Sequence, residues 1–184
     1  MAPRVLPDAT IRTPRLTLRA LGEVDIDATV QACTDPVTQR WLPLPRPYTR
    51  EHAAGWCTSE SELVRTSGQG LVRAIAAEDG LVGCIDLKRM DWEARTAEIG
   101  YWLHPAARGH GYMTEAVTAL ARWALVDNDL ARVELRVAQG NSASHRVAEL
   151  AGFTREGVAR QAGYTWDGQV DLVVYSLIPA DLTA

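Results

Sequence analysis

The sequence predicts one mixed α/β domain, and three observations support this prediction. The chain has 184 residues, a length typical of a single domain. Segments in which apolar and polar residues alternate, as in half-buried strands, are interspersed with segments of helical spacing. No repeat, low-complexity tract or linker divides the chain. We therefore expect a single domain over residues 1–184, built from antiparallel hairpins, then two strand–helix units, then a final hairpin.

The first half of the chain is expected to hold three strands and two helices. Residues 16–20 alternate between apolar and polar side chains, as a half-buried strand does. Asp35-Pro36 ends the first helix, and Thr49 is a typical N-cap for the second, after a proline-rich loop over 41–47. Asp79-Gly80 is typical of a hairpin turn between two strands. The expected elements are strand 16–20, helix 24–32, helix 49–65, strand 71–77 and strand 81–88.

The second half is expected to hold four strands and two helices. A glycine-rich turn follows the first of these strands and leads into a helix whose apolar positions cover a wide face. Gly152 is placed to end the last helix, and a turn over 166–169 joins the two final strands. The expected elements are strand 96–103, helix 112–126, strand 132–138, helix 141–151, strand 155–163 and strand 170–178.

Composition and charge argue against several classes of protein. The formal net charge is −4, which argues against broad nucleic-acid binding. Cys33, Cys57 and Cys84 form no CxxC or Cys/His cluster, so we expect no metal site, and their wide spacing fits reduced thiols in a cytoplasmic protein. The first residues lack the apolar core of a signal peptide, and no apolar run approaches the ~18 residues of a membrane span. We expect neither nucleic acid nor a membrane as a partner.

The Arg108–Thr114 turn is the most informative segment of the chain. Gly109 and Gly111 allow the backbone to approach a ligand closely and to adopt positive φ without penalty. The helix that begins near Tyr112 leaves its first N–H groups unpaired, and Arg108 can add a charge-assisted hydrogen bond. Together these features predict a diphosphate site. The pattern is neither a Walker loop nor a GxGxxG fingerprint, and taken alone it is also compatible with a turn that only joins strand and helix.

This turn resembles the phosphate motif [Q/R]xxGx[G/A] of the GNAT superfamily of acetyl-CoA-dependent N-acetyltransferases. Arg108 and Gly111 match the motif, while Met113 stands where a small residue is usual. The departure is similar to the RimJ/RimL-like branch, the ribosomal-protein N-terminal acetyltransferases, in which a GYMTEA-type helix start is common. Five further segments resemble this branch in the same order: TPRLTLRAL, WLPLPRPYTREHAAGW, AEIGYWLHP, NSASHRVAELAGFTREG and DLVVYSLIPADL.

The resemblance implies a fold and a cosubstrate. The fold is a central mixed, mostly antiparallel sheet of six to seven strands, flanked by about four helices, whose fourth and fifth strands splay apart. The cosubstrate is acetyl-CoA, with no metal, and its pantetheine arm would run beside Trp102 and Leu103. Its pyrophosphate would lie on the backbone amides of Arg108, Gly109, His110, Gly111, Tyr112, Met113 and Thr114.

The same resemblance assigns catalytic roles to Glu98 and Ser144. Amide formation from a thioester requires an uncharged amine and a thiolate that can be protonated. The family often carries its general base at the position of Glu98, whose alternative role is that of a cross-strand salt-bridge partner. In the motif NxxAxxxYxxxGF the acidic tyrosine is replaced by Ala148, so that acid is missing. Ser144 stands at the motif alanine, where it is either a proton donor or a hydroxyl that caps the first helical turn.

The remaining expectations concern the nucleotide and the acceptor. Asn141 is expected to cap the last helix, and in the family this residue also touches pantetheine. Arg146 either reaches the 3′-phosphate or lies on a solvated helix face. The acceptor would be a small-molecule or peptide amine, and the protein a monomer or a homodimer. A non-catalytic acyl-CoA sensor on the same fold is the alternative function. The candidate groove aromatics are Trp41, Trp56, Tyr164 and Trp166.

Overall fold

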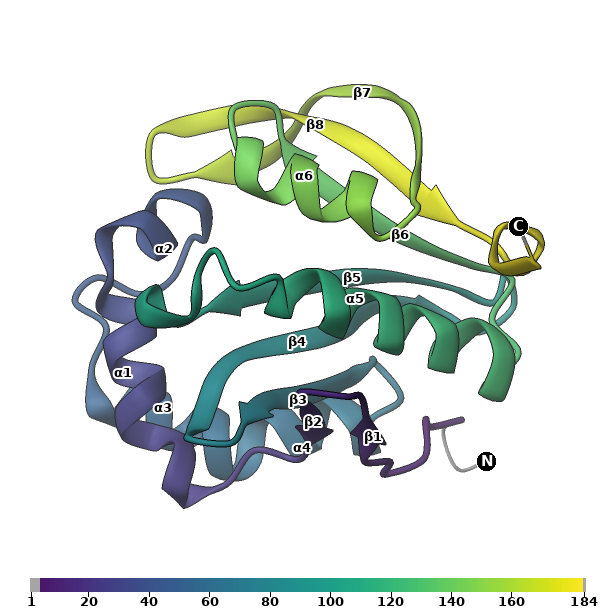
Figure 1. Ribbon diagram of the computed structural model, residues 1–184. Helices are drawn as coiled ribbons and strands as arrows, with labels where there is room; N and C mark the ends of the chain where they lie inside the picture. Colours follow the sequence, from purple (N-terminus) through teal and green to yellow (C-terminus); the bar gives the residue numbers. More distant parts are fainter. Residues whose placement is uncertain (1–3, 184) are drawn as a thin grey trace.

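A computed structural model describes residues 4–183 of the chain. Its strands form one sheet in the order β1-β2-β3-β4-β5-β6-β8-β7, and all neighbours are antiparallel except β5 and β6, which are parallel (Figure 1). The strands are β1 (Ile11–Arg12), β2 (Thr17–Arg19), β3 (Leu71–Ala77), β4 (Gly80–Asp91), β5 (Thr96–Leu103), β6 (Arg132–Ala138), β7 (Thr154–Thr165) and β8 (Gly168–Leu177).

This arrangement confirms the predicted class, a mixed and mostly antiparallel α/β sheet. The sheet has eight strands rather than the six or seven expected. The additional strand is β1, which pairs with β2 through only two residues, Ile11 and Arg12. So short a strand leaves no alternating pattern that the sequence could reveal.

The described residues hold six α-helices where about four were expected. These helices are α1 (Ile26–Thr34), α2 (Pro36–Trp41), α3 (Arg50–Gly55), α4 (Ser61–Thr66), α5 (Tyr112–Arg122) and α6 (Ser142–Leu150). Asp35 accepts a hydrogen bond from Thr38 N at 2.9 Å and caps α2, whose first residue is Pro36, so the dipeptide that ends α1 also starts a new helix. Helices α3 and α4 are the two ends of the predicted helix 49–65, and a π-helical segment over Trp56–Glu60 joins them.

Strands β5 and β6 separate after a short paired stretch. Residues 96–98 of β5 pair with residues 132–134 of β6, and no pairing continues beyond Glu98. The gap widens toward the end of the sheet where α1 and α2 lie (Figure 1). The predicted splay is therefore present, and it leaves one edge of the β5 backbone, from residue 99 to 103, unpaired with β6.

At β4 and β5, one face of the sheet is mainly apolar, while the other carries charged side chains. Ile85 lies opposite Tyr101 and Leu87 opposite Ile99, and this face packs in the main core with α5. The six predicted apolar positions of this helix segment are all buried, and each buried leucine or valine side chain contributes about 1.5–3 kcal/mol. They are Met113, Ala116, Val117, Leu120, Ala121 and Ala124. The other face places Cys84, Asp86 and Lys88 opposite Trp102, Gly100 and Glu98.

The three cysteines, Cys33, Cys57 and Cys84, are buried free thiols. Among residues 4–183, no group of three or more His, Cys, Asp and Glu side chains could hold a metal ion. No helix in that same range is long and apolar enough to cross a membrane.

Candidate functional site

The gap between β5 and β6 opens into a cavity of about 600 Å³, here called the interstrand cavity. It reaches both faces of the sheet, because the alternating residues Glu98 and Ile99 both line it. Other walls come from the start of α5, from α6, from the segment 41–43 and from the tip of the β7–β8 hairpin. Residues that line it include Trp41, Leu103, Arg108, Met113, Arg136, Asn141, Ser144, Val147, Tyr164 and Leu172.

A second cavity of about 320 Å³ lies against β4 on the face covered by α1 and α3, and it is here called the β4 cavity. Aromatic side chains and two carboxylates contribute to its lining. The two cavities meet, because Lys88, Tyr101 and Trp102 line both of them. The two cavities therefore adjoin at this part of β4 and β5. The β4 cavity is lined by residues that include Cys33, Tyr48, His52, Trp56, Glu60, Cys84 and Asp86.

The Arg108–Thr114 turn has the backbone expected of an anion site. Gly109 and Gly111 adopt φ of +81° and +77°, values that favour glycine. Gly111 is the N-cap of α5 and no side chain caps this helix, so its first N–H groups are open to a ligand. Gly109, His110 and Gly111 are exposed, while Tyr112 and Thr114 are half-buried and Met113 is buried in the cavity wall.

The Arg108 side chain lies between this turn and α2. Its Nη2 donates to Asp35 Oδ2 at 2.6 Å and to Thr38 Oγ1 at 3.0 Å. Burial of Asp35 raises its pKa, but the hydrogen bonds from Arg108 and from Thr38 outweigh this and leave the pKa below its ordinary value. Within residues 4–183, no acceptor is bonded to Nε or Nη1 of Arg108, so these donors are available to an anion.

Sequence reasoning missed Arg15, whose side chain contacts the same turn. Arg15 Nη1 donates to the His110 carbonyl at 2.9 Å, and its guanidinium carbon lies 4.9 Å from the centre of the Tyr112 ring. Its Nε donates to Glu115 Oε2 at 2.6 Å. No local pattern links an arginine before β2 to a turn almost a hundred residues later, so the sequence offered no signal for this contact.

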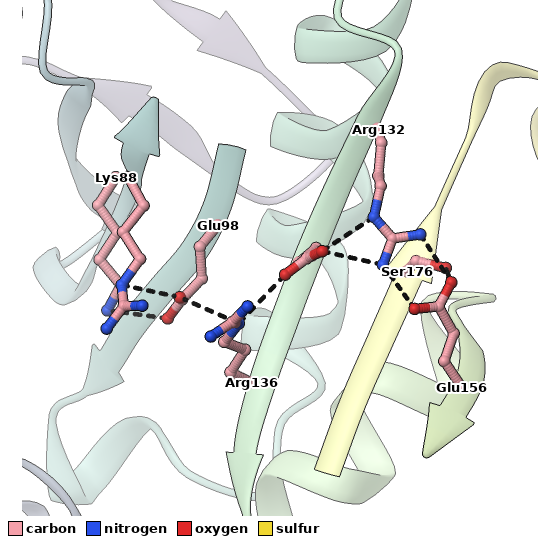
Figure 2. Close-up of polar contacts among 8 residues, drawn as sticks. Lys88, Glu98, Arg132, Arg136, Glu156 and Ser176 are labelled. Carbon is pink, nitrogen blue, oxygen red and sulfur yellow. Dashed lines mark hydrogen bonds and ion pairs between the residues drawn. The ribbon is translucent and has the colours of Figure 1, made fainter. Parts of the chain in front are cut away.

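Glu98 lies within an ion-pair network on the face opposite α5 (Figure 2). Its carboxylate lies 3.5 Å from Lys88 Nζ, 3.3 Å from Arg89 Nε and 3.8 Å from Arg136 Nε. The side chain is largely buried and lines the interstrand cavity. The structure therefore contains the cross-strand ion pair with a neighbouring lysine, which was one of the two roles considered for Glu98.

Asp86 is a second carboxylate near the junction of the cavities, and sequence reasoning missed it. Its Oδ1 accepts a hydrogen bond from Gly100 N at 3.1 Å. Burial raises its pKa, although Lys88 and this hydrogen bond act in the opposite direction. A Cβ at Gly100 would lie 2.7 Å from Asp86 Oδ1 and 2.6 Å from Lys88 Nζ, so a larger residue would displace these two side chains from their present positions. A lone aspartate within an otherwise apolar stretch of strand was the available signal.

The residues predicted on the last helix are divided between the cavity and the surface. Asn141 Oδ1 accepts from Ser144 N at 3.2 Å, which confirms that Asn141 caps α6. Asn141 and Ser144 both line the interstrand cavity, as do Trp102 and Leu103. Arg146 is exposed on α6 and does not line either cavity.

The four candidate groove aromatics occupy different places. Trp41 and Tyr164 line the interstrand cavity, and Trp56 lines the β4 cavity. Trp166, at the tip of the β7–β8 hairpin, instead donates its Nε1–H to the Leu44 carbonyl at 3.0 Å. This contact joins the hairpin to the proline-rich loop that borders both cavities.

The family model and the relatives that match this chain are all described as acetyltransferases. The model of the acetyltransferase (GNAT) domain matches residues 15–154. YdaF of Bacillus subtilis (strain 168) is 38% identical over 109 residues, which are 59% of this chain and 60% of that protein. The ribosomal-protein-serine acetyltransferase of Escherichia coli (strain K12) is 32% identical over 116 residues, 63% of this chain and 65% of that protein. Each of these alignments spans less than two thirds of the relative's length.

A solved structure supports the same fold over most of the chain. The Mycobacterium smegmatis RimJ structure, in complex with a CoA disulfide, superposes with a TM-score of 0.84 at 20% sequence identity. The superposition covers 96% of this chain and 88% of that chain. At this identity the similarity establishes the fold.

Proposed function

Because this chain belongs to the GNAT acetyltransferase family, we propose that it transfers the acetyl group of acetyl-CoA to a primary amine. The single observation that supports this most strongly is the placement of the Arg108–Thr114 turn at the mouth of the interstrand cavity. Open N–H groups at the start of α5 suit a diphosphate, and the adjacent splay of β5 and β6 suits an extended arm.

Acetyl-CoA would be held by the predicted residues in three sections. The diphosphate would accept hydrogen bonds from the backbone N–H groups of residues 108–114, with Arg108 adding positive charge. Pantetheine would pair with the free backbone edge of Trp102 and Leu103, as an added strand does. Asn141 and Ser144 would border the arm from α6. Arg146 is exposed on the same helix, and a contact with the 3′-phosphate remains a prediction for it.

The acceptor would enter through the β4 cavity and meet the thioester near Lys88, Tyr101 and Trp102. Attack requires the uncharged amine, so a base must remove a proton directly or through water. Glu98 stays our predicted base. Asp86 is a second candidate, because its raised pKa makes it a stronger proton acceptor, whereas three cations surround Glu98. Two acceptor classes fit this arrangement, a protein N-terminal α-amine and a small-molecule amine.

The test is release of free CoA thiol from acetyl-CoA in the presence of a panel of small amines and N-terminal peptides. Thiol release that depends on one amine class, with the acetylated product found by mass spectrometry, supports the transferase. Tight binding of CoA in calorimetry without thiol release for any amine would instead indicate an acyl-CoA sensor. No binding of CoA at millimolar concentration would refute both functions. Sedimentation of the same sample distinguishes a monomer from a homodimer.

A further inference from the structure

The hydroxyl of Tyr101 is a buried polar group without a partner. Within residues 4–183, its oxygen has no hydrogen bond, although the atom is inaccessible to solvent. Leaving a buried hydroxyl unsatisfied costs about 1–3 kcal/mol, so such a group in a folded protein calls for an explanation. A ligand that accepts a hydrogen bond from this oxygen would provide one.

Tyr101 lies where the reacting atoms of the proposed reaction would meet. It belongs to the part of β5 that has left β6, three residues after the last paired position, Glu98. It also lines both the interstrand cavity and the β4 cavity. The side chain lies on the α5 face of β5, so a thioester that enters through the interstrand cavity would come close to it, while an amine in the β4 cavity would approach the thioester from the opposite face.

The chain has lost the acid that the family motif would place on α6. The motif tyrosine is replaced by Ala148, which is fully buried in the main core and carries no polar group. Tyr101 lies on strand β5, and its side chain comes near α6. Ser144, which also lines the interstrand cavity, lies close enough to lower the pKa of the Tyr101 hydroxyl, although burial outweighs this effect. A phenol from β5 thus lies near the serine that faces it from α6.

We propose that Tyr101 donates the proton that the departing CoA thiolate accepts, a role that rests on the acetyl transfer proposed above. When the tetrahedral intermediate collapses, the carbon–sulfur bond breaks and its electron pair leaves with sulfur. The Tyr101 O–H proton passes to that sulfur and leaves a tyrosinate. The proton released by the attacking amine nitrogen then returns to the tyrosinate, so amine and thioester become amide and thiol with no net change in protons.

The environment of Tyr101 suits this step. Burial raises its pKa to about 12, so the phenol keeps its proton throughout the neutral range, although it becomes a weaker acid than an exposed tyrosine. The same burial disfavours a thiolate formed beside it and therefore raises the proton affinity of the sulfur. A hydrogen bond from the phenol would stabilise the sulfur as its negative charge develops in the transition state.

The test compares Tyr101→Phe with Ser144→Ala and with the wild type, using acetyl-CoA and an amine that the wild type accepts. Tyr101→Phe removes only the oxygen, and we expect kcat to fall about 10- to 100-fold, the lower part of the range for general acids, because a thiol leaves readily. The affinity for CoA in calorimetry should stay within about threefold. With the acetyl thioester of 4-nitrothiophenol, whose thiolate leaves without a proton, the variant and the wild type should have equal kcat/KM.

Tyr175→Phe is the matched control, because it removes another buried tyrosine hydroxyl, one that is bonded to His145 and outside both cavities. It should retain the wild-type kcat. A wild-type kcat in Tyr101→Phe would overturn the proposal, as would an equal loss with both thioesters, which would indicate a packing role. A loss confined to Ser144→Ala would assign the acid to Ser144 instead. If the wild type itself releases no thiol with any amine, the proposed function fails and this role fails with it.

Discussion

Arg15 and Glu115 are joined by a 2.6 Å hydrogen bond between Nε and Oε2, although 100 residues separate them in the chain. The Thr13 hydroxyl donates to the other oxygen of the same carboxylate at 2.6 Å. Burial of Glu115 raises its pKa, but these donors outweigh burial and hold the pKa below its ordinary value. The segment before β2 therefore anchors the first turn of α5, where the diphosphate is expected to bind.

Arg15→Ala should weaken CoA binding about tenfold, because hydrogen bonds from a charged group contribute roughly 1.5–3 kcal/mol and the substitution releases both Glu115 and the His110 carbonyl. Calorimetry with CoA measures the effect. Arg12→Ala removes an equal charge from an exposed position on β1 and is the control, with affinity expected within twofold. An equal loss in both variants would mean that overall charge, and not support of the turn, determines the affinity.

Gly111→Val should abolish detectable CoA binding, because the side chain fills the space of the phosphate and a branched residue is strained at φ of +77°. Gly152→Val is the matched control. Gly152 has φ of +81° at the end of α6, and a Cβ there would meet nothing within 4 Å. Both variants should lose similar thermal stability, but only Gly111→Val should lose CoA. Unchanged affinity in Gly111→Val would place the diphosphate elsewhere.

The sequence predicted elements that have a local signature and missed contacts between distant segments. The alternating strand 132–138, the cap at Thr49 and the glycines of the Arg108–Thr114 turn all depend on near neighbours, and the structure contains each of them. The contacts of Arg15 with His110 and Glu115 depend on how the sheet folds, which no window of sequence encodes. Strand β1 was missed for another reason, because its two residues are too few to form an alternating pattern.

Glu98→Gln should lower kcat at least tenfold while the Kd for CoA changes little, because the carboxylate faces the proposed reaction point rather than the Arg108–Thr114 turn. The rate of thiol release at saturating amine, measured from pH 6 to 9, tests this. Rates equal to the wild type across that range would remove Glu98 from the mechanism.

Asp86→Asn separates the two candidate bases. Because the pKa of Asp86 is raised, a base at this position would become active as pH rises through a value above the usual ~4 of aspartate. If Asp86 is the base, the Asn variant alone should lose the ascending limb of kcat/KM against pH. If that limb is retained in Asp86→Asn and lost in Glu98→Gln, Glu98 is the base.

Glu156 should contribute to acid stability through its pairing with Arg132 (Figure 2). Hydrogen bonds from Arg132, and then from Ser176, lower the pKa of Glu156 to about 2 from 4.5. A depressed pKa means that the stabilisation is complete above the unfolded value and is lost as pH falls toward about 2. Since the side chain is 41% exposed, solvent screening limits the effect to about 1 kcal/mol or less, about 2–4 °C in Tm.

Thermal denaturation of the wild type and Glu156→Gln between pH 7 and pH 2.5 tests this contribution. The variant should be less stable at pH 7, and the difference should shrink toward pH 2.5. Glu149→Gln changes an exposed glutamate on α6 and should follow the wild-type curve. A Glu156→Gln deficit that persists unchanged at pH 2.5 would show that the charge of Glu156 is not its source.

The sequence predicted some residues of the candidate site and missed others, and the difference has a physical reason. Backbone groups at the start of a helix have a sequence signature in glycine spacing, so Gly109 and Gly111 were found. Asp86 and Tyr101 gain their properties from burial and from the divergence of β5 and β6, which the chain acquires only on folding. Tyrosine is an ordinary residue for a strand and gave no signal, while the lone aspartate in an apolar strand was a signal that did not by itself indicate a role.

The bond between Trp166 and the Leu44 carbonyl has an evolutionary consequence. It links two surface segments that border the proposed acceptor entrance but lie outside the packed centre of the protein. Insertions or exchanges in either segment would alter which amine is admitted, while the thioester side and the packed core around α5 stay intact. New acceptor specificities can therefore evolve through changes in these two joined segments.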